Sequence, residues 1–376
     1  MFSVHIDTAR SWRGGQNQVL LTVLGLRKRG HRTSLIANSH GELYRRAPED
    51  LDLYPLAPRA DVDPLSAWKL SRLFLKLRPD VIHAHDAHAV AVAALARSLI
   101  GRRLSPPLIA SRRVDFHVGK HVFSRWKYSQ VHHFICASLA IQNMLIDDGI
   151  PHNRTTVVYE GIDLTLVDKA PQLDVHKEFG IPIEAPLICN VAALTAHKGQ
   201  RHLIDAAALV VREVPEARFL IVGTGELKDT LKRQIRRLHL ENNVILTGFR
   251  TDTLSILNGI DLFVMSSVTE GLGTSVLDAM AAGLPVISTR AGGIPESVVD
   301  GETGILVPVG DQTWLAQALV ALLRAPTERV KFGEAGRRRA HNIFSADRMV
   351  DEIVSVYAAW VDTTREAGIA RRPSSL

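Results

Sequence analysis

The sequence predicts an α/β protein of two domains, each built on a parallel β-sheet that helices cover. Short apolar runs alternate along the chain with segments of helix length, which is typical of parallel strands joined by helices. The chain has 376 residues, enough for two domains at roughly 100–200 residues each. After residue 163 the alternation gives way to a polar, proline-containing stretch and then starts again. We therefore predict an N-terminal domain over residues 1–162 and a C-terminal domain over residues 163–345.

The N-terminal domain is expected to begin with a strand over residues 2–7, a loop containing Gly14 and Gly15, and a helix over residues 16–29. The segment 66–77 carries one apolar and one basic stripe, which suits a helix covering the sheet and also a helix at a membrane surface. Further strands of this domain are expected at residues 33–37, 80–85, 108–110 and 134–137. Strands of the C-terminal domain are expected at residues 187–192, 218–222, 244–247, 262–265, 285–288 and 304–307.

Composition excludes several classes of protein. Apolar residues make up 46% and charged residues 22% of the chain, which is ordinary for a globular protein and excludes a disordered chain, a collagen and a coiled coil. No stretch approaches the roughly 18–20 consecutive apolar residues of a membrane-spanning helix, and the N-terminus lacks the features of a signal peptide. With two cysteines, Cys136 and Cys189, a disulfide scaffold is excluded and a cytoplasmic location is expected.

Positive charge is concentrated in the first half of the chain. Residues 1–162 hold 22 lysines and arginines against 13 aspartates and glutamates, whereas the remainder holds 23 against 26. This excess suggests an anionic partner, either an acidic lipid surface or an anionic small molecule, although a solvated surface rich in arginine would explain it equally well. Nucleic acid is disfavoured as a partner because the basic residues are not interleaved with aromatic ones.

Glycine-containing loops after expected strands are the candidate ligand sites, because open parallel sheets bind ligands beyond the carboxyl ends of their strands. Gly14 and Gly15 would let backbone amides approach a phosphate or a sugar at a helix start. Lys198 and Gly199, after residues 187–192, could neutralise a diphosphate. Neither loop matches a dinucleotide or Walker motif, so a tight turn and a surface lysine remain the alternatives.

A third loop combines a carboxylate with two glycines. Glu270 precedes Gly271 and Gly273, and a helix is expected to begin at Thr274 or the next residue. Backbone amides there could face an anion while Glu270 binds sugar hydroxyls. Asp278 follows Glu270 by eight residues, but the pattern from Ser275 to Asp278 also resembles a capping box, which would make Asp278 structural. A fourth loop, residues 291–296, carries two glycines and a proline and suits either an anion or a simple turn.

Histidines and arginines follow strands of the N-terminal domain. His83 and His85 share one face of an expected strand. A metal site is conceivable, but no third ligand with supporting acids is evident, so we expect packing or substrate contact and no metal. Arg112 and Arg113 follow residues 108–110 and could hold a phosphate or carboxylate through two parallel hydrogen bonds, or simply lie on the surface.

Individually these signals are weak, but their order resembles that of one family. The run from Glu270 to Ile287, continued by Gly292-Gly293-x-x-Glu296 and Gly301-x-x-Gly304, resembles the donor-site signature of the retaining GT-B glycosyltransferases of family 4. The likeness also includes Gly14-Gly15, residues 81–85, Gly161-Ile162-Asp163, His197-Lys198-Gly199 and Gly223-x-Gly225-Glu226.

The resemblance implies two Rossmann-like domains facing across a cleft. The N-terminal domain would bind the acceptor and the C-terminal domain the nucleotide sugar. A last helix, over about residues 346–360, would cross back to the N-terminal domain. Beyond it, we expect the polar tail at residues 365–376 to be disordered.

The resemblance also assigns roles to residues of this chain. Lys198 would neutralise the donor diphosphate, Glu270 would contact the transferred sugar, and these two would be the catalytic residues. Asp278 would lie near the ribose, where the family has glutamate, and Arg250 would lie near the base. Further donor contacts would come from Gly15, His197, Gly271, Leu272, Gly273 and Thr274. The acceptor-side candidates are Gly14, His85, Arg112 and Arg113.

The chain departs from the family pattern at two places. Ala192 stands where an arginine usually precedes the lysine by six residues, and Ser111-Arg112-Arg113 stands where some members carry a histidine. We predict a retaining glycosyltransferase that moves a sugar from a nucleoside-diphosphate sugar to a saccharide or lipid-linked acceptor in cell-envelope polysaccharide or lipopolysaccharide synthesis. No cofactor or metal is expected, and the enzyme would be cytoplasmic or peripheral at the inner membrane face. The alternative is a non-catalytic sugar-nucleotide-binding subunit. A dehydrogenase is disfavoured by the missing dinucleotide fingerprint.

Overall fold

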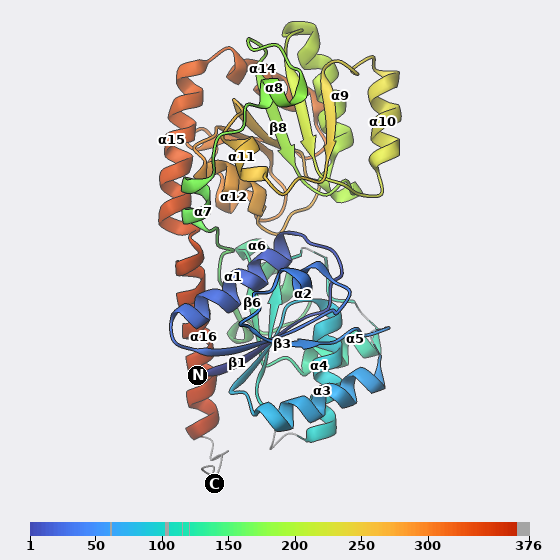
Figure 1. Ribbon diagram of the computed structural model, residues 1–376, viewed down its shortest axis with the longest axis vertical. Coiled ribbons are helices and arrows are strands. Elements are labelled where there is room, and N and C mark those ends of the chain that lie inside the picture. Colours follow the sequence, from blue (N-terminus) through green and yellow to red (C-terminus); the bar gives the residue numbers. More distant parts are fainter. Residues whose placement is uncertain (61, 102–104, 115, 120, 367–376) are drawn as a thin grey trace. The chain divides into compact units, whose positions relative to one another are not determined.

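The computed structural model describes residues 1–60, 62–101, 105–114, 116–119 and 121–366 (Figure 1). The chain divides into two compact units. Unit 1 comprises Met1–Gly161 and the residues from Ala346 on, and unit 2 comprises Ile162–Ser345. The boundary therefore falls one residue before the expected one. Most of the expected disordered tail, from residue 367 on, lies outside the described residues.

Unit 1 is built on a parallel sheet. Within the described residues this sheet has seven strands in the order β3-β2-β1-β4-β5-β6-β7, and all neighbours are parallel. The strands are β1 (Phe2–Asp7), β2 (Arg32–Ala37), β3 (Asp52–Pro55), β4 (Val81–Ala84), β5 (Leu108–Arg112), β6 (His133–Cys136) and β7 (Thr155–Val157). The two edge strands, β3 and β7, were not predicted, because each is short and only partly buried and so lacks the continuous apolar run of a central strand.

Helices cover both faces of this sheet. They are α1 (Gly14–Lys28), α2 (Glu42–Arg46), α3 (Pro64–Leu77), α4 (Ala87–Ile100), α5 (Val122–Ser129), α6 (Leu139–Asp147), the short 3₁₀ helix η1 (His152–Arg154) and α16 (Ala346–Glu366). Neighbouring residues of β4 show the two faces: Ile82 packs in the cluster that includes α3 and α4, whereas Val81 packs in the cluster that includes α16. Burial on both faces explains why the central strands are mostly apolar, although β1 and β4 also bury the polar residues His5, Asp7 and His83.

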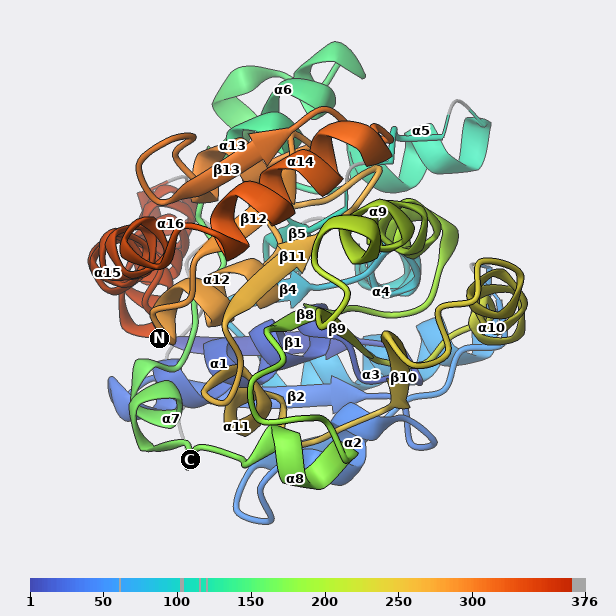
Figure 2. The same ribbon diagram turned by 90° about the horizontal axis from the view of Figure 1, so that it is seen from above.

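The last helix belongs to unit 1, as the family resemblance implied. It begins at Ala346 and extends to Glu366, beyond the expected end at residue 360. Its Tyr357 is fully buried, and its hydroxyl lies 2.5 Å from Nδ1 of His83 on β4. At the other end of the helix, Arg29 at the end of α1 forms an ion pair with Asp351 at 2.5 Å. Both views show α1 and α16 side by side (Figures 1 and 2).

Unit 2 repeats the architecture. Among the described residues its sheet has six parallel strands in the order β10-β9-β8-β11-β12-β13. They are β8 (Leu187–Val191), β9 (Arg218–Val222), β10 (Val244–Gly248), β11 (Leu262–Met265), β12 (Val286–Thr289) and β13 (Gly304–Val307). The helices are α7 (Leu164–Lys169), α8 (Val175–Phe179), the 3₁₀ helix η2 (Ala196–Lys198), α9 (Gln200–Glu213), α10 (Lys228–Arg237), α11 (Thr253–Leu257), α12 (Thr274–Ala281), α13 (Ile294–Ser297), α14 (Gln312–Leu323) and α15 (Pro326–Ile343).

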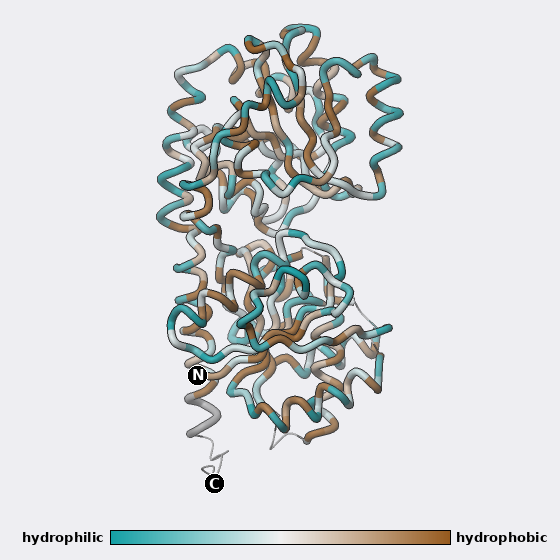
Figure 3. Tube along the Cα trace, in the orientation of Figure 1, coloured by the Kyte–Doolittle hydropathy of each residue, from teal (hydrophilic) through white to brown (hydrophobic). Residues whose placement is uncertain are grey.

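Apolar residues concentrate in the strands of both units, and polar residues in the outer helices and loops (Figure 3). In each parallel sheet the carboxyl ends of the strands meet at one edge. In unit 2 this brings together the loops after β8, β11 and β12. In unit 1 it brings together the residues that follow β1, β4, β5 and β7. The predicted two α/β domains with parallel sheets are therefore confirmed, and the candidate loops of each lie at the expected edge.

Candidate functional site

A lysine and a glutamate form the centre of the candidate donor site in unit 2. Lys198 ends the 3₁₀ helix after β8, and Glu270 lies in the loop after β11. The Nζ atom of Lys198 lies 2.5 Å from Oε2 of Glu270, and the two side chains are only 19% and 11% exposed. Ser267 donates a hydrogen bond from its hydroxyl to the same carboxylate oxygen at 3.0 Å. Ser267 was missed by the sequence reasoning, because a serine at a strand end has no distinctive pattern.

Two glycines allow the loops around this pair to approach each other closely. A Cβ atom on Gly199 would lie 2.0 Å from the carbonyl oxygen of Ser266, and one on Gly292 would lie 1.8 Å from that of Glu270. Both glycines have a positive φ, +65° and +50°, a backbone conformation that residues with a side chain rarely adopt. Backbone hydrogen bonds connect the same loops, from Val268 to His197 at 2.8 Å and from Gly293 to Glu270 at 3.2 Å. The backbone around Lys198 and Glu270 is therefore closely packed.

The start of α12 leaves backbone amides beside Glu270. Gly273 is the N-cap, with φ of +86°, and Thr274 is the first helical residue. The first amides of a helix have no partner within the helix and attract anions. The side chain of Leu272 is fully buried, so this residue can offer a ligand only its backbone.

Asp278 is not part of a capping box. Since α12 begins at Thr274, Ser275 already lies inside the helix, and the capping interpretation is wrong. Burial raises the pKa of Asp278 to about 7. No hydrogen bond within the described part of the chain ends on its carboxyl group. A half-buried carboxyl group without a partner, one turn inside the helix, is available to a ligand.

Arg250, His197 and Ala192 follow strands of the same sheet: Arg250 follows the edge strand β10, and the other two follow β8. Arg250 is held by Asp252, with nitrogen–oxygen distances of 2.8 and 2.7 Å, and by Glu178 at 2.8 Å. These carboxylates raise the pKa of Arg250 further above its already high value. Nδ1 of His197 lies 3.2 Å from the Thr195 hydroxyl. Ala192 follows β8 and contributes no charge, so Lys198 is the cation that the structure places beside Glu270.

The candidate acceptor edge in unit 1 holds a buried ion pair. Nε of Arg113 lies 3.2 Å from Glu160, and the side chains are 12% and 9% exposed. Nη1 of Arg113 also lies 3.1 Å from Nδ1 of His85. Arg112 turns away from this group and contacts the Tyr128 hydroxyl and the Phe116 carbonyl oxygen. The structure thus joins two of the acceptor candidates and adds Glu160, which follows the unpredicted strand β7.

Gly14 and Gly15 form the first turn of α1 and do not lie in a loop before it, so the helix begins two residues earlier than predicted. A Cβ on Gly15 would meet no atom within 4 Å, so open space faces this residue. The next residue, Gln16, accepts a hydrogen bond from the Arg13 amide at 3.1 Å and donates one to the carboxylate of Asp7 at 3.1 Å. The helix start is therefore connected to the end of β1.

Three buried histidines lie together behind this edge. The register of β1 and β4 pairs His5 with His83, and Nδ1 of His5 lies 3.0 Å from Nε2 of His85. Sequence reasoning missed His5, because strand register cannot be deduced from the pattern of a single strand. The ring nitrogens are engaged by one another and by neighbours: Ser3 on His5, Tyr357 and Ser111 on His83, and Arg113 on His85. The ligand atoms lie within 4.8 Å of one another, and each ring nitrogen of the three histidines lies within hydrogen-bond distance of a partner.

This network predicts that unit 1 loses stability in mild acid. Burial lowers the pKa of His5 to about 3 and the pKa values of His83 and His85 well below the usual value of 6.5. At pH values between the lowered pKa of the folded state and the usual 6.5, the unfolded chain binds more protons than the folded chain. The free energy of unfolding therefore falls as the pH drops below about 6.5. Each histidine contributes up to about 1.4 kcal/mol per pH unit. Asp7, whose pKa burial and the neighbouring Asp86 raise to about 6, opposes this trend below pH 6.

Urea unfolding at a series of pH values between about 7.5 and 5 measures this slope. The variant His5→Gln should have a shallower slope than the wild type. His152→Gln is the control, because His152 is exposed in a surface 3₁₀ helix. Equal slopes in all three proteins would show that the cluster does not titrate on unfolding.

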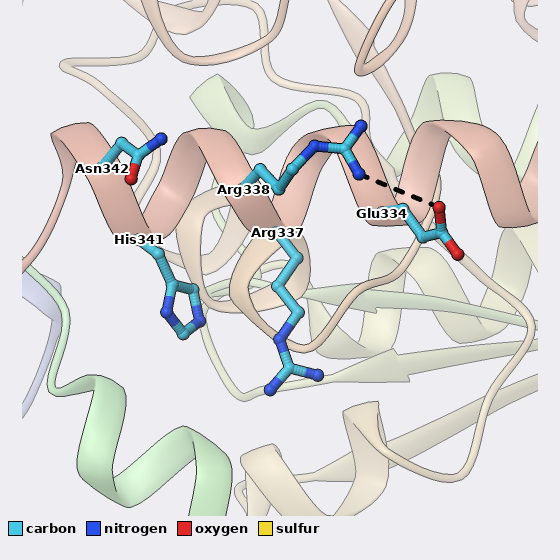
Figure 4. Close-up of a pocket in the computed structure, with 5 residues that line it drawn as sticks. All are labelled: Glu334, Arg337, Arg338, His341 and Asn342. Atoms are coloured by element: carbon cyan, nitrogen blue, oxygen red, sulfur yellow. Dashed lines mark ion pairs between the residues drawn. The ribbon is translucent and has the colours of Figure 1, made fainter.

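A surface groove along α15 is a separate feature. It is lined by Glu334, Arg337, Arg338, His341 and Asn342, all from α15 (Figure 4). Its two arginines already have carboxylate partners, Arg338 with Glu334 at 3.8 Å and Arg337 with Asp168 at 2.8 Å. We therefore do not assign it to the donor or the acceptor.

Comparison with known proteins identifies the family. The family model described as Glycosyltransferase Family 4 matches residues 12–166, and the model described as Glycosyl transferases group 1 matches residues 172–339. Together the two models span most of both units. The chain is a family 4 glycosyltransferase. The family inferred from the order of the sequence motifs is thereby confirmed.

Relatives of this glycosyltransferase span most of its length. It is 28% identical over 297 residues to N-acetyl-alpha-D-glucosaminyl L-malate synthase of Bacillus anthracis, 77% of each chain. It is 24% identical over 347 residues to the capsular polysaccharide biosynthesis glycosyltransferase CapM of Staphylococcus aureus, 88% of this chain and 91% of CapM. Anabaena HepE, solved with UDP and glucose, is similar in structure with a TM-score of 0.82 at 22% identity, over 96% of this chain and 100% of that one. The structural likeness confirms the GT-B fold.

Proposed function

We propose that this glycosyltransferase uses a nucleoside-diphosphate sugar as donor and transfers the sugar with retention of anomeric configuration. The observation that carries the proposal is the group formed by Lys198, Glu270 and the start of α12. Negative charge grows on the leaving diphosphate as the bond to the sugar breaks. Positive charge from a lysine and from the first amides of a helix, placed close to the diphosphate, stabilises this negative charge.

Each residue of the donor site has a proposed role. Lys198 leaves Glu270 and pairs with the diphosphate when the donor binds. The carboxylate of Glu270 then accepts hydrogen bonds from the hydroxyls of the transferred sugar. Asp278 contacts the ribose. Its pKa of about 7 means that it is partly protonated at neutral pH in the free protein and can both donate and accept. Ribose hydroxyls suit such a group.

Retention follows if the acceptor attacks from the face that the diphosphate leaves. The acceptor oxygen bonds to the anomeric carbon, the bond to the phosphate oxygen breaks, and the acceptor proton passes to the departing phosphate. Glu270, which keeps its hydrogen bond from Ser267, acts here in binding the sugar hydroxyls, so no covalent sugar–enzyme intermediate is invoked.

The acceptor is proposed to be a saccharide or a lipid-linked saccharide of the cell envelope. Two relatives of this chain support this assignment: CapM, which is named for capsular polysaccharide biosynthesis, and LpsE of Rhizobium meliloti, which is named for lipopolysaccharide core biosynthesis. The carboxyl edge of the unit 1 sheet, with Arg113, Glu160 and His85, is the proposed acceptor side. None of the described helices is both long and apolar enough to cross a membrane, and we propose a peripheral position at an anionic membrane face.

Thermal unfolding with UDP, GDP, ADP, CMP and NAD, each with magnesium or with a chelator, tests the donor site. A nucleotide at about 100 times its dissociation constant should add about 2.7 kcal/mol to the free energy of unfolding, a rise of several degrees in Tm. We expect one nucleoside diphosphate to raise Tm equally with magnesium and with chelator, since Lys198 and the helix amides supply the positive charge. A magnesium-dependent rise would contradict the metal-independent site, and a rise with NAD alone would contradict the donor class.

A second function has one observation in its favour. Ala192 contributes no charge where relatives of this type are expected to carry an arginine, so the diphosphate meets less positive charge than usual. A sugar-nucleotide-binding subunit without transferase activity would show the same rise in Tm but no transfer to any acceptor and no hydrolysis of the donor.

A further inference from the structure

Helix α3 presents two different faces. Ala67, Leu70 and Phe74 are buried against the rest of unit 1, as expected for a helix that covers the sheet. Asp63 caps the helix by accepting a hydrogen bond from the Ser66 amide at 2.9 Å, and Pro64 occupies its first turn. The helix packs beside α4 (Figure 1). Its structural role is therefore fulfilled by one face, and the other face is left to solvent.

The second face of α3 combines exposed apolar and basic side chains. Leu65, Trp68 and Leu75 are 60%, 56% and 43% exposed. They repeat at intervals of three and seven residues and so form one stripe along the helix. The stripe is joined by three exposed cations, and we call the whole set the outer face of α3: Leu65, Trp68, Lys69, Arg72, Leu75 and Lys76.

Among the residues that the structure describes, the cations of this face have no ion-pair partner. No ion pair joins Lys69, Arg72 or Lys76 to a carboxylate within the described residues. After the cap at Asp63, the helix contains no acidic residue. The exposed Trp68, Leu65 and Leu75 would gain free energy by leaving water, and the cations beside them would be attracted to negative charge. A surface that suits this face therefore has an apolar interior and an anionic exterior.

We propose that the outer face of α3 docks this glycosyltransferase on the surface of an anionic lipid bilayer. Trp68 and the leucines enter the boundary between headgroups and acyl chains, while the three cations pair with anionic headgroups. A second copy of this chain is not the occupant, because a two-fold contact would bring two sets of three cations together. The inference rests on one part of the proposed function, the lipid-linked acceptor. Docking through α3 would bring unit 1 close to an acceptor that is held in the membrane.

Helix α10 provides a matched control within the same chain. It carries Lys228, Lys232 and Arg236, which are exposed and spaced four residues apart. It has no exposed large apolar side chain, since its apolar residues Leu231 and Ile235 are buried. If charge alone attracted the protein to a membrane, removing the cations of either helix would weaken binding equally. If α3 docks on the membrane, only removal of the α3 cations should weaken binding.

The experiment is co-sedimentation of the full chain with vesicles of phosphatidylcholine, and of phosphatidylcholine with about one third phosphatidylglycerol. We expect binding to the anionic vesicles that weakens as salt is raised. The triple variant Lys69→Gln, Arg72→Gln, Lys76→Gln should bind roughly 100-fold more weakly, at about fivefold per cation removed. Trp68→Ser should bind roughly tenfold more weakly. The triple variant Lys228→Gln, Lys232→Gln, Arg236→Gln should bind like the wild type.

A second measurement places the tryptophan. Vesicles with brominated acyl chains should quench the fluorescence of the wild type, and this quenching should be lost in Trp68→Phe. Equal loss of vesicle binding in the α3 and α10 triple variants, absence of binding by the wild type, or quenching that persists in Trp68→Phe would each overturn the docking surface. Nucleoside diphosphate binding and transfer to a soluble acceptor, measured without vesicles, should be unchanged in every α3 variant. If the proposed function is wrong, the measurements of nucleotide binding and of transfer will show it, and the sedimentation experiment will not.

Discussion

Lys198→Ala and Glu270→Gln should change nucleoside diphosphate binding in opposite directions. In the free protein Lys198 is paired with Glu270 at 2.5 Å. Loss of the lysine removes a charge-assisted contact to the diphosphate, and we expect affinity to fall about 10- to 100-fold. Neutralisation of Glu270 releases the lysine from its partner, so affinity for the diphosphate without sugar should rise a few-fold.

Both variants should nevertheless lose transfer activity by about 10²–10³-fold. Lys198→Ala removes positive charge that stabilises the leaving group, and Glu270→Gln replaces a charged acceptor of the sugar hydroxyls with a weaker, neutral one. Calorimetric titration with the nucleoside diphosphate that most raises Tm measures the affinity of each variant for the diphosphate. Initial rates with the corresponding nucleotide sugar measure its transfer activity.

Lys228→Ala, on the exposed surface of α10, is the matched control for loss of a lysine in unit 2. It should leave binding and transfer unchanged. If Glu270→Gln weakened diphosphate binding as much as Lys198→Ala, the pair would be a structural unit and the proposed exchange of partners would be wrong. Wild-type transfer rates in both variants would refute the assignment of the donor site.

Gly292→Ala should disrupt the same site through the backbone. A Cβ at this position would lie 1.8 Å from the carbonyl oxygen of Glu270, and the residue has a φ of +50°. Overpacking costs about 1–3 kcal/mol and the left-handed conformation about 1–2 kcal/mol, so we expect a loss of stability of about 2–5 kcal/mol. Relief of the contact would shift the backbone of Glu270, and a displacement of about 1 Å near reacting groups can cost about 10²-fold in rate.

Gly301→Ala separates the effect of the close contact with Glu270 from the effect of the positive φ. Gly301 also has positive φ, +75°, but a Cβ there would meet no atom within 4 Å. We expect this control to lose about 1–2 kcal/mol while retaining transfer activity. Thermal unfolding and initial rates of both variants at a temperature well below either Tm make the comparison. Equal loss of activity in the two variants would show that the close approach to Glu270 is unimportant.

Much of the fold followed from pattern, because central parallel strands are buried on both faces. The strands predicted at residues 218–222 and 262–265 match the observed β9 and β11, which are central in the unit 2 sheet. Burial on both faces makes such strands continuously apolar and recognisable. The edge strands β3 and β7 lack that double burial and were missed. The edge strands β10 and β13 of unit 2 were predicted nevertheless, because each keeps an apolar run.

The candidate site was predicted to a similar extent. Lys198 and Glu270 were chosen because loops that follow parallel strands meet at one edge, and the structure places them in direct contact. The capping interpretation of Asp278 required Ser275 to be the N-cap, but the N-cap is Gly273, whose positive φ depends on local backbone geometry. The outer face of α3 was predicted as basic, but the exposure of Trp68 became visible only once the opposite face was seen to be buried.

The sequence by itself determined the class of fold, the division into two units and the loops that could hold a ligand, because these depend on periodicity and on the residue types at strand ends. The tertiary structure decided which side chains meet. The pairing of Lys198 with Glu270, the third histidine at His5 and the partnership of Arg113 with Glu160 join residues that lie far apart in the chain. Strand register and the order of strands in a sheet bring such residues together, and neither is encoded in the pattern of one segment.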